Sequence, residues 1–228
     1  MSQLRRATAR GKRLLMEAAL RLLARNRSFQ ALGLRELARE AGLNPNTFYR
    51  HFKTLDDLGL ALIESIAEQL RKPLRERRRE AAMSADDERP RSPNELGFDL
   101  GRGERVTHES VKSFFDFVLA HPEAFLVGVR EFYGPSPVLR RALRETIHGF
   151  ATDLADDIRD FDLLPNVDSD TVAQLSETVM QQLFLLSLDY IESKDQREAI
   201  QRQAEREVLM LFTGAIVLSR QAPEYVVD

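Results

Sequence analysis

Two neighbouring polar side chains, Asn46 and Thr47, have the chemistry needed to read DNA base edges. An Asn amide pairs with adenine through two hydrogen bonds, and a Thr methyl group packs against the thymine methyl in the major groove. Pro45 precedes them at the leading end of the same short segment, and Arg35 offers a phosphate contact from the segment before it. An amino-terminal arm that follows the DNA backbone or enters a minor groove would add three cations, Arg5, Arg6 and Arg10.

The elements that must position these side chains are two short helices within residues 34–52. The first has an apolar face at helical spacing, made of Leu34, Leu37, Ala38 and Ala41. Gly42 supplies the left-handed conformation that ends this helix, and Asn44 followed by Pro45 starts the second. The pattern predicts a helix-turn-helix with Phe48 and Phe52 in its core.

Charge is unevenly distributed along the chain, although the formal net charge is only −3. Residues 1–55 contain 12 Lys and Arg side chains against 3 acids, whereas the remaining residues contain 21 against 33. A basic amino-terminal part is attracted to phosphate and an acidic remainder is repelled by it, which orients the molecule on a polyanion. The alternative is an ordinary solvated basic face, which the coincidence with the helix-turn-helix disfavours.

Helical patterning continues over the rest of the chain, without a strand pattern or an internal repeat. We predict helices over residues 8–25, 55–82, 109–120, 122–132, 137–160, 169–192 and 195–220. Thr54 with Asp57 predicts a capping box at the start of the second of these helices, and Pro73 predicts a kink or a break within it. Residues 84–107 lack periodicity and predict a mobile loop or a lid.

The amino-terminal residues resemble the TetR family of bacterial transcription regulators. The likeness covers about residues 8–62 and lies in Leu37 to Leu43 and Phe48 to Phe52. It implies that Tyr49 and His51 contact phosphates, although packing of Tyr49 against the first helix is an alternative. The family commonly has a phosphate-contacting Lys where this chain has Leu55, so Lys53 would take that part. The expected DNA-binding set is therefore Arg5, Arg6, Arg10, Arg35, Pro45, Asn46, Thr47, Tyr49, Arg50, His51 and Lys53.

Further residues look like the TetR subgroup that represses unsaturated fatty-acid synthesis and senses long-chain acyl thioesters. They are Ser28-Phe29, Phe48 to Phe52, Asp57 to Leu60, and Arg130-Glu131 followed by Gly134 and Ser136. The resemblance implies an acyl-chain cavity lined by Ile66, Phe114, Phe117, Val118, Phe125, Val129, Phe132, Phe150 and Leu183. For each of these side chains the alternative is ordinary core packing. Four arginines have two alternative roles, a contact with the ligand headgroup or a place on a solvated helix face. They are Arg130, Arg140, Arg141 and Arg144.

A head of this size makes few base contacts, so specificity requires two copies. The last two predicted helices are apolar around most of their circumference near residues 183–186 and 208–212, which is unusual for a monomer surface. We expect them to pair with the same helices of a second subunit, or else to be buried deep within one chain. The expected interface residues are Phe184, Leu188, Leu211, Phe212, Ala215 and Leu218.

Catalytic chemistry has little support in the sequence. The four histidines form no H-x-x-x-H pair, and there is no nucleophile elbow or dinucleotide fingerprint. We therefore expect a protein that is not an enzyme and needs no cofactor or metal ion. The chain has no cysteine, no apolar run of membrane-helix length and no signal-peptide pattern, so the expected location is the cytoplasm, without membrane contact.

The predicted fold class is all-α, with a three-helix DNA-binding head (residues 1–54) and a larger helical ligand-binding and dimerisation body (residues 55–228). The predicted function is a homodimeric transcriptional repressor that binds a palindromic DNA operator. Long-chain acyl-CoA or acyl carrier protein would control it, and its targets would be fatty-acid desaturation and synthesis genes. One alternative is an efflux regulator that responds to a drug or another hydrophobic ligand. A second is a DNA-tethered protein-interaction module without a ligand.

Overall fold

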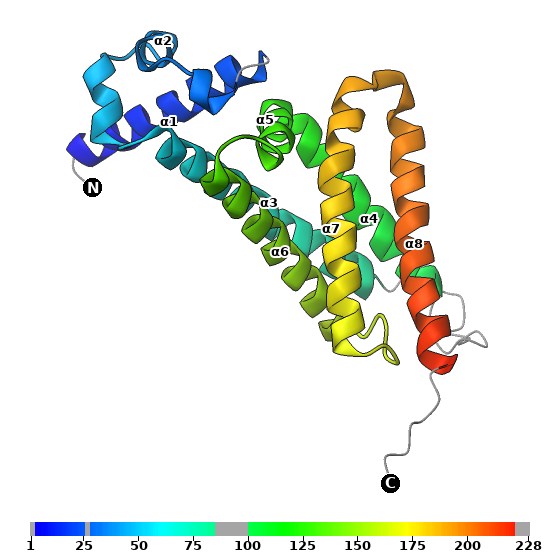
Figure 1. Ribbon diagram of the computed structural model, residues 1–228. Helices are drawn as coiled ribbons and strands as arrows, with labels where there is room; N and C mark the ends of the chain where they lie inside the picture. The colour runs from blue at the N-terminus through cyan, green and yellow to red at the C-terminus, as the bar shows by residue number, and fades with distance from the viewer. Residues whose placement is uncertain (1–2, 26–27, 85–99, 222–228) are drawn as a thin grey trace. The chain divides into compact units, whose positions relative to one another are not determined.

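The computed structural model describes residues 3–25, 28–84 and 100–221, with the backbone alone at residues 3–8, 100 and 221. In these ranges the chain forms helices and no strand, which confirms the all-α prediction (Figure 1). Contacts divide the chain into a first unit, residues 1–68 with 121–146, and a second unit, residues 69–120 with 147–228. The functional boundary predicted after residue 54 stays a prediction. None of the described helices has the length and apolar character that crossing a membrane requires.

The first unit is built on α1 (Gln3–Ala24), which packs against α2 (Leu34–Glu40) and α5 (Pro122–Phe132). It also contains η1 (Phe29–Ala31), η2 (Pro45–Arg50) and the first parts of α3 (Leu55–Met83) and α6 (Pro137–Asp160). The core side chains come from all of these elements, and fully buried members include Leu15, Leu23, Leu37, Phe48, Leu58 and Leu139. Phe48 and Phe52 lie in this core, as the sequence predicts.

The turn between α2 and η2 follows from its sequence. Gly42 has a φ of +65°, and its N–H donates to the carbonyl of Arg39, while the N–H of Leu43 donates to the carbonyl of Ala38. This pair of hydrogen bonds ends α2 in a Schellman motif. Asn44 then caps the next element by accepting a 2.9 Å hydrogen bond from the N–H of Asn46. The element that follows is a 3-10 helix rather than the expected α-helix.

A capping box starts α3, as the pattern of Thr54 and Asp57 predicts. The Asp57 N–H donates to the Thr54 hydroxyl oxygen at 3.0 Å, and the Asp57 carboxylate accepts from the N–H of Thr54 at 3.0 Å and of Lys53 at 2.9 Å. Three backbone donors at the helix start are thereby satisfied. The helix continues through Pro73 without interruption, so the predicted break does not occur.

The second unit contains the later parts of α3 and α6 together with α4 (Leu100–Ala120), α7 (Ser169–Glu192), η3 (Lys194–Gln196) and α8 (Arg197–Gln221). α7 and α8 lie side by side as an antiparallel hairpin joined through η3, and α4 packs against both (Figure 1). Phe115 of α4 stacks on Tyr190 of α7 with ring centroids 4.1 Å apart. Asp168 caps α7 by accepting from the Thr171 N–H at 2.9 Å.

The predicted irregular segment is shorter than expected, because α4 begins at Leu100 rather than near residue 109. Gly101 and Gly103 weaken the helical pattern in the sequence, but tertiary contacts hold this turn in place. Arg102 Nε donates to the carbonyl of Ala82 near the end of α3 at 2.9 Å, and Val106 is buried against Ala82. The remainder of the predicted loop, residues 85–99, lies outside the described residues.

Candidate nucleic-acid interface

The turn from α2 into η2 presents the expected base-reading side chains to solvent. Pro45 and Asn46 are exposed at the start of η2, and Thr47 beside them is half-buried. Tyr49 is 64% exposed, so packing against α1 does not account for it. Among the other expected DNA contacts, those with exposed side chains are Arg10, Arg35, Arg50 and Lys53. For Arg5 and Arg6 the structure describes only the backbone, in α1.

His51, like Thr47, is a half-buried member of the expected set. Burial of the imidazole, together with the nearby positive charges of Lys12 and Arg50, lowers the pKa of His51 below its ordinary value. The ring is therefore neutral at pH 7 in the free protein, able to donate one hydrogen bond from whichever ring nitrogen carries the proton. Such a group can bind a phosphate oxygen without the desolvation cost of a full charge.

An ion pair fixes α2 on α1. Arg21 Nε of α1 donates to Glu40 Oε1 of α2 at 2.9 Å. This hydrogen bond is the largest cause that lowers the pKa of Glu40, with the positive charges of Arg25 and Arg39 adding to it. The pair spans 19 residues of sequence and holds the first element of the helix-turn-helix against its supporting helix.

The carboxyl-terminal end of α1 is also held by α5. The guanidinium of Arg130 donates to the carbonyls of Leu23 and Ala24 at 3.3 and 3.4 Å, which are carbonyls of the last turn of α1. Next to it, buried Glu131 accepts a 3.3 Å hydrogen bond from the N–H of Phe29. Arg130 is one of the arginines considered as a headgroup contact, and its guanidinium here supports α1. The sequence signal for this role was the adjacent Arg130-Glu131 pair.

A small cavity of about 80 Å³ lies within the second unit. Its walls come from α3, α4, α6, α7 and α8, and they are mostly aliphatic and aromatic. Among the expected acyl-chain contacts, Phe114 and Leu183 line it. The other expected residues of this unit lie elsewhere, namely Phe117, Val118 and Phe150, and the first unit holds Ile66, Phe125, Val129 and Phe132. The nine side chains are therefore not brought together around one described cavity.

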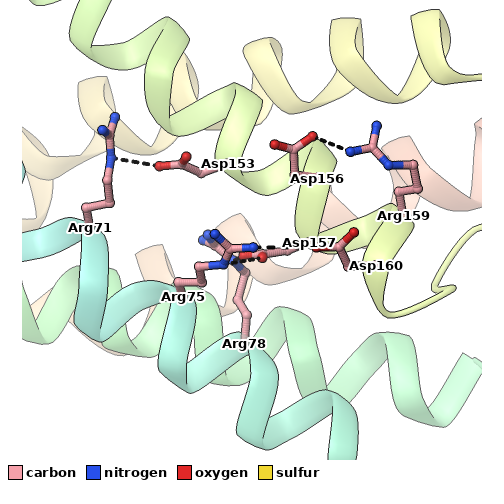
Figure 2. A network of polar contacts seen from close by, with 8 residues as sticks. All are labelled: Arg71, Arg75, Arg78, Asp153, Asp156, Asp157, Arg159 and Asp160. Carbon is pink, nitrogen blue, oxygen red and sulfur yellow. Dashed lines mark hydrogen bonds and ion pairs between the residues drawn. The ribbon is translucent and has the colours of Figure 1, made fainter.

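Two charged residues in the cavity wall, Arg78 and Asp157, were not expected from the sequence. Figure 2 shows them within a network in which α3 carries the arginines Arg71, Arg75 and Arg78 and α6 carries the aspartates Asp153, Asp157 and Asp160. Arg78 Nε donates to Asp157 Oδ2 at 2.7 Å with both side chains almost fully buried. Only the packing of α3 against α6 reveals which charged residues pair.

The expected interface residues line one hairpin, α7 and α8. Leu218 is 67% exposed, and it lines a groove along α8 together with Met210, which is 59% exposed. The rest are partly or wholly covered within the chain, with Ala215 buried and four half-buried residues, Phe184, Leu188, Leu211 and Phe212. α8 therefore presents large apolar side chains to solvent in a single chain.

Comparison with known proteins identifies the helix-turn-helix. Residues 15–62 match the family model described as bacterial regulatory proteins, tetR family. This part of the chain, residues 15–62, is therefore similar to the DNA-binding part of tetR-family regulatory proteins. The match covers α2, the turn at Gly42 and η2, the same elements that present Asn46 and Thr47.

Solved structures share the fold of this chain over most of its length. The fatty acid degradation regulator FadR from Bacillus halodurans is 15% identical, with a TM-score of 0.66 over 90% of this chain and 95% of that chain. FadR from Bacillus subtilis in complex with stearoyl-CoA is also 15% identical, with a TM-score of 0.60 over 88% and 97%. A fatty acid metabolism regulator from Clostridium perfringens is 17% identical, with a TM-score of 0.59 over 88% and 97%. At these identities the likeness establishes the fold.

Proposed function

We propose that this protein is a homodimeric repressor of the TetR type that binds a palindromic operator through Asn46 and Thr47. The observation that carries the proposal is the capped turn at residues 42–46, which holds these two side chains at the leading end of η2. Around them the exposed cations Arg35, Arg50 and Lys53 supply phosphate contacts. The tyrosine hydroxyl of Tyr49 and the neutral imidazole of His51 add two hydrogen-bonding groups.

Dimerisation through α7 and α8 follows from the need for two half-sites. A dimeric helix-turn-helix protein reads half-sites about one turn of DNA apart, roughly 34 Å, and a single head gives too few base contacts for specificity. The exposed apolar side chains of α8 support an interface between copies of this chain, because such a patch otherwise faces water. The interface would be isologous, with the same hairpin on both sides.

The proposed effector is long-chain acyl-CoA or acyl carrier protein, and the proposed targets are genes of fatty-acid desaturation and synthesis. The apolar walls of the cavity in the second unit and the shared fold with a FadR that binds stearoyl-CoA support this effector. At about 80 Å³ the cavity is smaller than the ~300–1,000 Å³ typical of ligand sites, so the helices must separate to admit a chain. Binding therefore changes the helical body, and we propose that α3 carries this change to the head.

Operator binding with and without effector tests the proposal. Genomic DNA fragments selected by the purified protein give the operator, and fluorescence anisotropy then measures its affinity at fixed salt. We expect the operator affinity to change severalfold with oleoyl-CoA or palmitoyl-CoA, because the coupling free energy between an effector site and a second binding site is usually ~1–3 kcal/mol. Free coenzyme A and buffer without acyl-CoA serve as controls. If operator affinity stays the same with every acyl-CoA, the proposed effector is wrong. If the protein binds random duplex as tightly as the selected fragments, the proposed operator binding is wrong.

A further inference from the structure

One nitrogen of a buried arginine has no partner beside the cavity of the second unit. Arg78 is 2% exposed, and it lines the cavity among apolar side chains such as Leu74, Phe114 and Leu183. Its Nε donates to Asp157, but its Nη2 is buried without a hydrogen-bond acceptor anywhere in the described part of the chain. A buried donor without an acceptor is costly, and in native proteins such a group calls for an explanation.

The opposite charge in the same wall is already engaged. Asp157 Oδ2 accepts from Arg78 Nε at 2.7 Å, and Oδ1 lies 3.1 Å from Nε of Arg75 (Figure 2). Each carboxylate oxygen of Asp157 therefore lies beside a guanidinium, although Oδ1 is paired by charge alone and accepts no hydrogen bond, whereas Arg78 has an N–H without an acceptor. The cavity offers a donor to a ligand and no unpaired negative charge, which favours an oxygen acceptor over a cation.

We propose that Arg78 is the polar anchor of an effector site in this cavity, for a ligand with a long apolar chain ending in an acyl carbonyl oxygen. The carbonyl or carboxyl oxygen accepts a hydrogen bond from Nη2, and the chain packs among the apolar walls after they separate. Free fatty acids and acyl thioesters share this chemistry. The inference rests on the proposed function in one respect, namely that the helical body binds an effector.

The position of the anchor explains how one contact selects the ligand. A chain that ends in an amine or a methyl group leaves Nη2 without an acceptor, and a site built to bond an oxygen rejects analogues that lack it. An amine would also place a second positive charge beside Arg78 in surroundings of low dielectric constant. Selection therefore comes from Arg78 and chain length from the apolar walls.

Direct binding to the full-length protein without DNA tests the proposal. Displacement of a fluorescent fatty-acid probe gives dissociation constants for laurate, lauroyl-CoA and dodecylamine. The test variant is Arg78→Met, and the matched control is Arg79→Met, the same change at the exposed neighbouring position. Because Arg78→Met leaves Asp157 buried with fewer partners, the double variant Arg78→Met/Asp157→Met removes both members of the pair and keeps the test usable.

We expect Arg78→Met and the double variant to bind the acyl ligands at least about tenfold more weakly. This factor corresponds to the lower end of the free energy that a hydrogen bond to a charged group contributes. Arg79→Met should bind them as the parent does. If the variants lose affinity for laurate alone, the group bound by Arg78 is a carboxylate. If they lose affinity for lauroyl-CoA alone, it is a thioester, and if they lose affinity for both, it is the shared carbonyl. The inference is overturned if the loss of affinity is smaller than this, or if Arg79→Met shows the same loss. It is also overturned if the parent protein binds dodecylamine as tightly as laurate.

Parallel operator measurements separate this inference from the proposed function. If acyl-CoA changes operator affinity equally in the parent and the double variant, the effector response stands and the role of Arg78 is wrong. If acyl ligands bind with the expected dependence on Arg78 but operator affinity does not change, the anchor stands and the proposed regulation by acyl-CoA is wrong.

Discussion

The imidazole of His51 lies so close to the backbone of Gly11 that a methyl group at position 11 would approach Nε2 to within 2.8 Å. Only a glycine in α1 leaves room for the ring in this position. The nearest atom is at the end of a side chain, so a larger residue would displace the imidazole rather than the backbone. Gly11 thus determines where a proposed phosphate contact lies.

Gly11→Ala should separate stability from DNA binding. Alanine favours a helix interior by about 1 kcal/mol over glycine, so the free energy of unfolding should be unchanged or slightly raised. Operator affinity should fall roughly three- to tenfold, because the displaced imidazole loses its phosphate. Urea unfolding and anisotropy measure the two effects. The double variant Gly11→Ala/His51→Ala should bind like His51→Ala, and additive losses would show that position 11 acts in another way.

Asn46 and Lys53 should respond differently to salt and sequence. Asn46→Ala should weaken operator binding by about 1–3 kcal/mol and leave binding to random duplex nearly unchanged, because a base contact is lost. Lys53→Ala should weaken both and reduce the slope of log affinity against log salt by about one. Titrations of both duplexes at several salt concentrations measure these slopes. Equal effects of the two substitutions would contradict the assignment of Asn46 to a base.

Glu131 should make stability depend on pH. Its burial, with a smaller effect of Asp56, raises the pKa of the carboxyl group, although the hydrogen bond from Phe29 opposes this. The folded state therefore holds a proton that the unfolded chain releases at ordinary carboxyl pKa values. The free energy of unfolding should fall as pH rises from that ordinary value through the raised one, at up to about 1.4 kcal/mol per pH unit.

Glu131→Gln keeps an acceptor for the Phe29 N–H and cannot ionise, so its stability should change less between pH 4.5 and 7.5. Urea unfolding across this range measures the difference from the parent protein. Glu64→Gln is the control, because Glu64 is an exposed glutamate of the same unit. Parallel curves for the parent and Glu131→Gln would exclude Glu131 as the source of the dependence.

Leu218→Glu should disrupt the proposed dimer. Leu218 is 67% exposed in the single chain, so the substitution should leave the protomer folded. A carboxylate enclosed without a partner in an apolar interface costs about 3 kcal/mol or more, which raises the dimer dissociation constant over a hundredfold. Sedimentation velocity measures the state, and Val138→Glu is a control at an exposed position in the first unit. An unchanged sedimentation profile would place the interface elsewhere.

Helix ends with strong local signals could be predicted from the sequence. α5, α6 and α7 begin and end where predicted, because Pro122 and Pro137 occupy first helical positions and Asp168 is an N-cap. The start of α4 could not be predicted from the sequence, because the contact of Arg102 with Ala82 outweighs the low helix propensity of Gly101 and Gly103. Local propensity yields here to tertiary packing.

The surroundings of the cavity were harder to predict than the helices. Periodicity shows which face of a helix is apolar, but it does not distinguish core packing from a cavity wall, so Phe114 and Phe125 look alike in sequence. Phe114 lines the cavity and Phe125 is buried in the other unit. Arg78 and Asp157 are 79 residues apart, and their pairing depends on which helices pack together.

The opposing charges of α3 and α6 repeat at the same intervals, four and then three residues, in Arg71, Arg75 and Arg78 and in Asp153, Asp157 and Asp160. Sliding one helix along the other by half a turn would leave each cation opposite a gap, whereas a whole turn of about 5.4 Å would bring two of the three cations to the next carboxylate. The matched repeats thus favour alignments of the two helices that differ by whole turns. Any axial movement between these two helices should occur in whole-turn increments rather than continuously.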